Sequence, residues 1–154
     1  MLEEMYQEVI LEESAKPCGR VDAVDDEHAS HQYNPTCGDD LTVAVKLRDD
    51  LPADSNLQII EKVDWTGQGC SISTASASIM AQLMEDKTAE QAFTLVQNFK
   101  ELMDSRGQGI DQDKMDQLGD ASVFVGTSKF PARIKCALLS WVAFEDSLRQ
   151  KISK

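Results

Sequence analysis

The sequence predicts an α+β fold built on a three-stranded antiparallel sheet with one covered face. Two observations lead to this prediction. Apolar and polar residues alternate over 41–48, which is the period of a half-buried strand. Apolar residues recur every three or four positions over 2–15, 88–103 and 131–152, which is the period of an amphipathic helix. Because 154 residues suit one core, we expect a single domain over 1–154.

The first expected element is a short amphipathic helix over 2–15. Its apolar positions share one helical face: Leu2, Met5, Tyr6, Val9 and Ile10. Lys16-Pro17-Cys18-Gly19 ends this helix, and the acidic stretch up to Asp26 is expected to form a loop. Cys18 has no second thiol nearby in the sequence, which favours the role of a bystander.

Three strands are expected next. The first contains His28 and His31, which would lie on opposite faces because side chains alternate along a strand. Structural or surface roles are therefore favoured over metal binding for both histidines. The second strand covers 41–48, a connection containing Pro52 covers 49–55, and the third strand covers 57–65. Short links between the strands favour an antiparallel meander.

Helices account for most of the second half. A helix over 72–84 follows two closely spaced glycines, which would place Cys70 at the helix start, where the helix dipole favours a negatively charged sulfur. Thr88 and Gln91 have the spacing of a capping box and predict the start of the next helix. Pro131 predicts the start of the last one. Between these two helices, 105–130 is expected to be irregular, with a short helical turn over 115–118.

Composition restricts the class of function. The formal net charge is −12, and 15 basic residues are scattered among 27 acidic ones, which argues against a nucleic-acid partner. No signal sequence and no apolar run long enough to span a membrane is recognisable, so a cytoplasmic location is expected. Cysteines stay reduced in that compartment, and the four here are expected to be ligands, nucleophiles or core residues rather than disulfides.

The stretch 34–40 is the centre of the candidate site. Pro35 fixes the backbone and Gly38 permits a left-handed turn, so Cys37 and Asp39 can point at one place. A thiolate and a carboxylate are costly to bury unless they are paired or bound to a metal. Two other cysteines stand at the start of one expected helix and in the first turns of another. Together with the residues of the turn they form a candidate ligand set: Cys37, Asp39, Cys70 and Cys136.

Spacing alone leaves two interpretations of this set open. There is no Cys-x2-Cys or His-Glu-x2-His motif, and scattered cysteines are often buried bystanders. The glycine turn and the helix starts favour a three-thiolate site instead, because backbone amides can support thiolates there. Arg133 lies three residues before Cys136 on the same helical face, so its guanidinium could lie next to the sulfur, with a surface cation as the alternative.

Three motifs resemble the iron–sulfur cluster assembly proteins of the IscU/NifU N-terminal family, most closely its SufU branch. They are Asn34-Pro-Thr-Cys-Gly-Asp39, Gly67-Gln-Gly-Cys-Ser-Ile-Ser-Thr-Ala-Ser-Ala-Ser78 and Ser128-Lys-Phe-Pro-Ala-Arg-Ile-Lys-Cys-Ala-Leu-Leu-Ser-Trp141. The resemblance implies a three-stranded antiparallel sheet with helices packed on one face and a metal site at one end. Carried over by position, it implies Cys37, Asp39, Cys70 and Cys136 as metal ligands, Cys37 as the sulfur acceptor, and Arg133 as the arginine near the site.

Two departures from the family pattern favour sulfur transfer over cluster building. The scaffold branch has a histidine before the last cysteine, where this chain has Lys135, and it has a Leu-Pro-Pro-Val-Lys segment, which is absent here. The extra residues within 105–130 also resemble an insertion of the SufU branch. The resemblance further implies docking on a pyridoxal-phosphate-dependent cysteine desulfurase, whose side chain would replace Cys37 on the metal and free it to attack the enzyme's persulfide.

Three hypotheses follow. The first is a zinc-dependent sulfur acceptor and carrier, hence a sulfurtransferase, acting with a cysteine desulfurase and a downstream iron–sulfur assembly complex. Zinc suits three thiolates and one carboxylate and keeps bound sulfurs deprotonated. The second is a scaffold for iron or a transient [2Fe–2S] cluster. The third is a zinc hydrolase or deaminase, which would need an open metal position and a glutamate base, and the deaminase pattern is missing.

Overall fold

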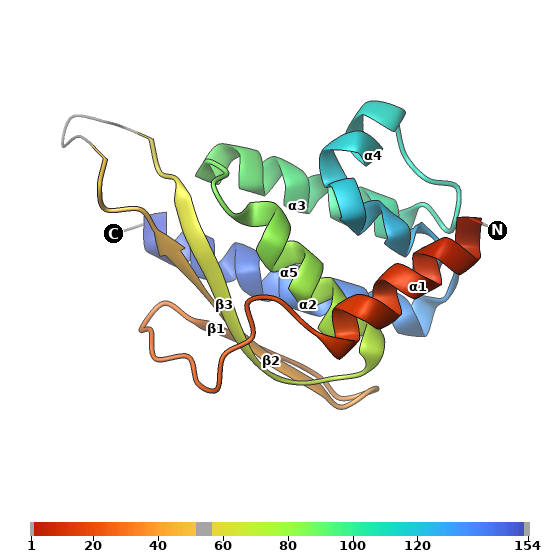
Figure 1. Cartoon of the computed structure of the whole chain (residues 1–154), viewed down its shortest axis with the longest axis horizontal. Helices are drawn as coiled ribbons and strands as arrows, with labels where there is room; N and C mark the ends of the chain where they lie inside the picture. The colour runs from red at the N-terminus through yellow and green to blue at the C-terminus, as the bar shows by residue number, and fades with distance from the viewer. Residues whose placement is uncertain (1, 52–56, 153–154) are drawn as a thin grey trace.

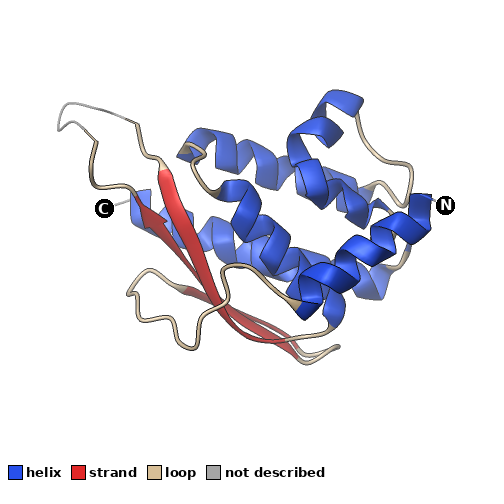
Figure 2. Cartoon of the chain, in the orientation of Figure 1, coloured by secondary structure: helices blue, strands red, loops and turns tan. Residues whose placement is uncertain are grey.

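The computed structural model describes residues 2–51 and 57–152, and Figure 1 shows helices packed against one side of a small sheet. The strands are β1 (Ser30–Asn34), β2 (Asp39–Leu47) and β3 (Ile60–Gln68). The helices are α1 (Leu2–Ala15), α2 (Ser71–Met84), α3 (Ala89–Asp104), α4 (Gln112–Leu118) and α5 (Pro131–Ile152). This arrangement confirms the predicted fold class (Figure 2).

The sheet is an antiparallel meander in the order β1-β2-β3, as predicted. The β1–β2 hairpin is tight: Asn34 pairs with Asp39, and Ser30 pairs with Val43. On the other side of β2, the ladder with β3 runs as far as the pair of Asp40 and Gln68. The sheet therefore brings the start of β2 next to the end of β3, which is where the chain enters α2.

Two strand boundaries differ from the prediction. The third strand begins at Ile60 rather than at residue 57 and continues to Gln68, because pairing with β2 carries the ladder through the glycine at position 67. Leu57 is left exposed. His28 precedes β1, so the prediction that both histidines belong to one strand was wrong. The predicted connection over 49–55 lies partly outside the described residues.

A segment expected to be a plain loop extends the sheet locally. The amide of Val21 donates to the carbonyl of Trp65 at 2.8 Å, and the amide of Trp65 donates to the carbonyl of Gly19 at 3.0 Å. The Arg20 guanidinium lies 5.6 Å from the centroid of the Trp65 ring. These contacts cover part of the outer edge of β3, which would otherwise expose unpaired backbone groups.

The core lies between the sheet and the helices. Alternate residues of β2 (Leu41, Val43 and Val45) are fully buried, as the period of two predicts. The Trp141 ring of α5 stacks on Phe99 of α3 with 4.0 Å between centroids, and its Nε1–H donates to Ser76 Oγ on α2 at 2.9 Å. These contacts join three helices and fix α5 against α2.

The helix starts agree with the sequence signals. The Thr88 side chain accepts a hydrogen bond from the Gln91 amide, and the Gln91 side chain accepts one from the Thr88 amide, so the predicted capping box is present. Pro131 is the first residue of α5. The region 105–130 contains α4 and two 3₁₀ turns, Gly119–Val125 and Thr127–Lys129, so it holds more helix than the single turn expected.

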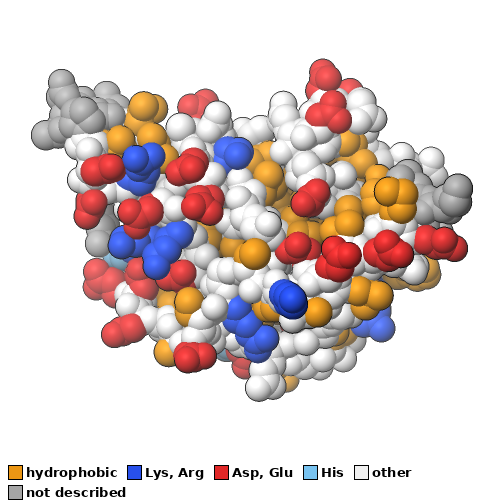
Figure 3. Space-filling view, viewed as in Figure 1, with side chains coloured by type: hydrophobic (Ala, Val, Ile, Leu, Met, Phe, Trp, Pro, Cys, Tyr) orange, Lys and Arg blue, Asp and Glu red, His pale blue; other side chains and the backbone are white. Residues whose placement is uncertain are grey.

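Acidic groups are spread over the molecular surface. On the face in Figure 3, Asp and Glu side chains are distributed across the whole view and are more frequent than Lys and Arg. Within the described part of the chain, no helix combines the length and apolar character that crossing a bilayer requires.

Candidate metal centre

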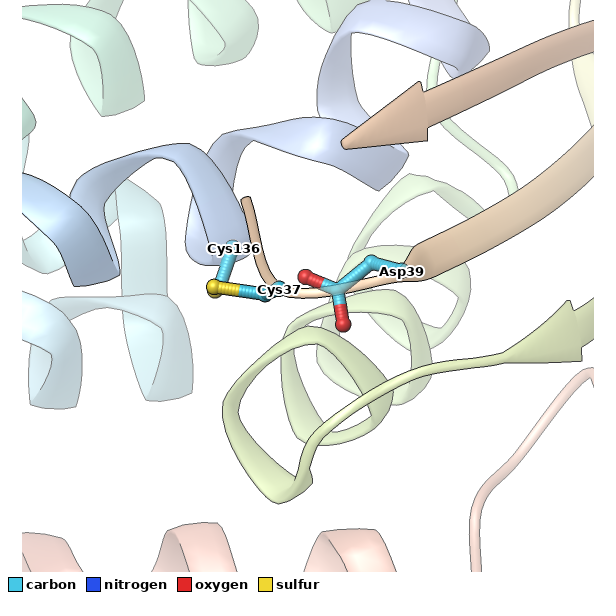
Figure 4. A group of neighbouring side chains, drawn as sticks. All are labelled: Cys37, Asp39 and Cys136. Carbon is cyan, nitrogen blue, oxygen red and sulfur yellow. The ribbon is translucent and has the colours of Figure 1, made fainter. Parts of the chain in front are cut away.

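Three of the four predicted ligands meet at one end of the sheet. Cys37 lies in the turn between β1 and β2, Asp39 is the first residue of β2, and Cys136 lies in the second turn of α5 (Figure 4). The two sulfurs and one carboxylate oxygen lie within 4.8 Å of one another, and the two Sγ atoms are 3.2 Å apart. The fold thus brings together donors that are 99 positions apart in the chain.

Cys70 lies beside this group, at the N-cap of α2. Its amide donates to Asp39 Oδ1 at 2.9 Å, and its thiol is half-buried and close enough to Cys136 to influence that group's ionisation. The set of three donors within 4.8 Å does not include its sulfur. Three of the predicted ligands thus meet at one location, Cys70 is linked to it through the bond from its amide to Asp39, and a role for the Cys70 sulfur as a ligand stays a prediction.

The turn that carries Cys37 is held by Asn34. The Asn34 carbonyl accepts the amide of Gly38, whose φ of +73° is the left-handed conformation that the sequence predicted for this glycine. The Asn34 side chain accepts the amide of Thr36 at 3.2 Å and donates through Nδ2 to Cys136 Sγ at 3.9 Å. A single buried side chain thus connects the Cys37 turn to the sulfur on α5.

The electrostatics of the site favour a cation. Burial raises the pKa of the Cys136 thiol well above its ordinary value, and the neighbouring side chains of Cys37, Asp39 and Cys70 raise that pKa further. These effects favour the protonated thiol of Cys136 over the thiolate at neutral pH when no cation is present. A metal ion would reverse this balance, because coordination stabilises the thiolate directly.

The buried carboxylate of Asp39 fits a metal ligand. Its Oδ1 accepts hydrogen bonds from the Cys70 amide and from Ser73 Oγ. Its Oδ2 is buried and, among the residues that the structure describes, has no hydrogen-bond partner. An unpaired buried carboxylate oxygen costs free energy unless something compensates it. Sulfur donors with one carboxylate oxygen are a set that zinc accepts, so the residues present fit a bound zinc ion.

Arg133 lies near the cluster but outside it. Its side chain is exposed in the first turn of α5 and lines a cavity of about 740 Å³ with parts of α1 and the start of α2. It is not part of the donor group, and the described hydrogen bonds to the Asp39 carboxylate come from Cys70 and Ser73. Its predicted role at the site stays a prediction.

The remaining candidates lie apart from the donors. Cys18 is exposed, and its backbone amide and carbonyl bond to Ser78 Oγ and to Trp65 Nε1–H. His31 is exposed on β1, 2.6 Å from an oxygen of Asp40. Neither residue belongs to the group of three donors.

Sequence reasoning did not identify two polar residues of the site, Ser73 and the side chain of Asn34. The Asn-x-Thr pattern at 34–36 is typical of a turn in which the asparagine side chain accepts an amide two residues later, so the bond to Thr36 could have been predicted. No local pattern indicates the bond from Asn34 to Cys136 or from Ser73 to Asp39, because the partners are 102 and 34 positions apart.

Known proteins share both the sequence and the fold. The family of the NifU-like N-terminal domain matches residues 5–137. The chain is 37% identical over 150 residues to a zinc-dependent sulfurtransferase SufU of Bacillus subtilis, covering 97% of this chain and 93% of the relative. It is 34% identical to an iron–sulfur cluster assembly scaffold protein IscU of Streptococcus pyogenes, covering 97% and 86%.

One solved structure carries a similar description. It is an iron–sulfur cluster assembly scaffold protein for the SUF system from Fervidobacterium islandicum. This chain resembles it with a TM-score of 0.73 and 28% sequence identity, and the match covers 95% of this chain and 98% of that one.

Proposed function

The chain belongs to the NifU-like N-terminal domain family, and we propose that it is a zinc-dependent sulfur acceptor and carrier, a sulfurtransferase, in iron–sulfur cluster assembly. The observation that carries this proposal is the meeting of two sulfurs with a buried Asp39 carboxylate that has one unpaired oxygen. Similarity to a zinc-dependent sulfurtransferase over nearly the whole chain supports it.

Four residues would hold the ion: Cys37, Asp39, Cys70 and Cys136. When bound, zinc would keep the coordinating sulfurs deprotonated at neutral pH without taking part in redox chemistry. The residues around the site would fix the donors, since Asn34 joins the Cys37 turn to Cys136. Because ligands come from three separate elements, metal binding and folding should be coupled.

Cys37 is the proposed sulfur acceptor. Its side chain is partly exposed in a turn flanked by the exposed residues Thr36 and Gly38, whereas Cys136 is fully buried. The partner is proposed to be a pyridoxal-phosphate-dependent cysteine desulfurase that carries a persulfide. The Cys37 thiolate attacks the terminal sulfur of that persulfide, a new S–S bond forms on Cys37, and the desulfurase cysteine leaves as a thiolate. The exchange needs no additional oxidant or reductant.

The proposal also includes a downstream partner, a cellular compartment and a role for Arg133. The persulfide on Cys37 would pass to a downstream iron–sulfur assembly complex, and the reduced thiols that this chemistry needs suit the cytoplasm. The exposed guanidinium of Arg133 is proposed to act near the site once a partner docks, by stabilising the released Cys37 thiolate.

The test is persulfide formation on Cys37. We expect the wild-type protein to stimulate a cysteine desulfurase and to gain the mass of one sulfur atom when free cysteine is supplied. A Cys37→Ala variant should do neither, whereas Cys18→Ala, which removes an exposed cysteine outside the donor group, should behave as the wild type. Full stimulation and sulfur uptake by Cys37→Ala would contradict the proposal.

A second candidate function is a scaffold for a [2Fe–2S] cluster, because relatives described as scaffolds share the fold and the family. Anaerobic loading with iron and sulfide distinguishes a cluster scaffold from a sulfur carrier. A stoichiometric brown cluster that transfers to an apo-acceptor would favour the scaffold, and a colourless protein that retains zinc would favour the sulfur carrier. The presence of Lys135 before Cys136 and the absence of a Leu-Pro-Pro-Val-Lys segment support the carrier.

A further inference from the structure

The carboxylate of Asp39 is held from one side only. Asp39 is fully buried, and both donors to its Oδ1 come from the start of α2: the Cys70 amide at 2.9 Å and Ser73 Oγ at 3.1 Å. Its Oδ2 receives no hydrogen bond within the described residues. The two oxygens of one carboxylate therefore have different environments, and this difference orients the group.

The Ser73 hydroxyl lies within hydrogen-bond distance of three acceptors, of which Asp39 is the carboxylate. It is fully buried, and its Oγ lies 3.0 Å from the Cys70 carbonyl, 3.7 Å from Cys70 Sγ and 3.1 Å from Asp39 Oδ1. A hydroxyl carries one hydrogen, so it donates to one acceptor at a time. The carboxylate is the charged acceptor of the three, and charge-assisted hydrogen bonds are about twice as strong as neutral ones.

We propose that Ser73 is a positioning residue that fixes Asp39 through Oδ1 and thereby presents Oδ2 to the metal as a single-oxygen ligand. This inference rests on the proposed zinc site. Without the hydroxyl, only the Cys70 amide holds Oδ1, and the carboxylate gains freedom to rotate. Outer-shell hydrogen bonds of this kind orient metal ligands, and removing one typically costs about 10- to 100-fold in metal affinity.

Gly69 supports the same interpretation. A Cβ atom added at this position would overlap Ser73 Oγ and would lie 2.9 Å from Asp39 Oδ1. Only glycine leaves room for the serine and the carboxylate to meet. Gly69→Ala is therefore a second variant that should disturb the pair without altering any donor atom.

The experiment is a double-mutant cycle on zinc affinity. Affinity is measured by competition with a zinc-binding chromophore for the wild type, Ser73→Ala, Asp39→Ala and the double variant. We expect Ser73→Ala to weaken zinc binding about 10- to 100-fold in the wild-type background and to have almost no further effect in the Asp39→Ala background, since residues that act through one another are not additive. Gly69→Ala should weaken binding in the same Asp39-dependent way.

A matched control separates this role from general destabilisation. Ser78 is also fully buried on α2, but its Oγ bonds to a carboxylate oxygen of Glu13 on α1 at 2.6 Å, away from the donor group. Ser78→Ala should lower thermal stability and leave zinc affinity unchanged. Cobalt substitution gives an independent measurement, because the ligand-field bands should change in Ser73→Ala and not in Ser78→Ala.

Two results would overturn the inference. One is a Ser73→Ala variant that binds zinc as tightly as the wild type. The other is a loss of zinc affinity on Ser73→Ala that is equally large with Asp39 present and with Asp39 replaced by alanine. A wild-type protein that does not retain zinc would overturn the proposed function instead, and the inference with it. The wild-type measurement therefore distinguishes the two failures.

Discussion

Replacing Asn34 by alanine should weaken zinc binding more than it weakens the fold. The Asn34 side chain is 5% exposed and makes two hydrogen bonds, one from the Thr36 amide at 3.2 Å and one to Cys136 Sγ at 3.9 Å. The variant keeps the third bond of the turn, in which the Asn34 carbonyl accepts the Gly38 amide, because this bond belongs to the backbone. The turn should therefore form, but it should lose the link to α5 that the Asn34 side chain provides.

The magnitudes follow from these contacts. Two neutral side-chain hydrogen bonds contribute about 1 to 2 kcal/mol together, and the one to sulfur is long and belongs at the low end. For a chain of this size, 1 kcal/mol corresponds to about 2–4 °C in Tm, so the metal-free variant should melt about 2–8 °C lower. Zinc affinity should fall about 10-fold, the lower part of the range for outer-shell residues, since the lost bond to the ligand sulfur is weak.

Asn98 offers a matched control for this prediction. Its side chain is 6% exposed and donates to Gln117 Oε1 at 3.2 Å, joining α3 to α4 away from the donor group. Both variants are followed by thermal unfolding of the metal-free protein and by zinc competition. Asn98→Ala should lower Tm without changing zinc affinity. Unchanged zinc affinity in Asn34→Ala, or an equal loss in Asn98→Ala, would refute the reasoning.

Two further predictions concern stability. Zinc at about 1,000 times its Kd should add about 4 kcal/mol to the free energy of unfolding and raise Tm by about 8–16 °C. A chelator and the Cys136→Ser variant should each remove this increase in Tm, whereas Cys18→Ser should keep it. An equal increase in Cys136→Ser would refute the prediction. Burial tends to raise the pKa of Asp26, but bonds from Lys151 and from the His28 amide, with the nearby charges, lower it overall. Because the folded-state pKa is depressed, this stabilisation is full above the ordinary value of 3.8 and is lost as pH falls through the folded-state pKa. The Tm difference between metal-free wild type and Asp26→Asn should therefore shrink below about pH 4, and a difference that stays constant would contradict the assignment.

Local signals predicted most of the fold because their causes are local. Alternation over 41–48 located β2, and the Thr88 capping box and Pro131 located the starts of α3 and α5. The start of β3 was misplaced by three residues, because an apolar residue at position 57 continues the pattern although pairing with β2 begins later. Strand ends depend on the partner strand, and this information is not present in the strand itself.

In the candidate site, too, local features were predictable from the sequence and contacts between distant elements were not. The Cys37 turn was predictable from Pro35 and Gly38, and Cys70 and Cys136 joined the candidate set because they stand at or near helix starts, with motif resemblance as additional support. Ser73 was not, because in the sequence it is one of several small residues of α2 that suggest close packing. Its polar partner, Asp39, lies on another element 34 positions earlier. A tertiary hydrogen bond of this kind leaves no periodic pattern in the sequence.

The architecture also gives a physical reason why Cys37, rather than another sulfur, should accept and carry sulfur. Cys136 lies within the long helix α5, which is fixed to α2 and α3 through Trp141, so its backbone cannot shift without moving that helix. The Cys70 backbone is tied to Asp39, so its displacement would disturb a second ligand. Cys37 is partly exposed in the turn between β1 and β2, and its backbone belongs to no strand or helix. Under the proposed function, Cys37 therefore combines partial exposure with a backbone that lies outside the strands and helices.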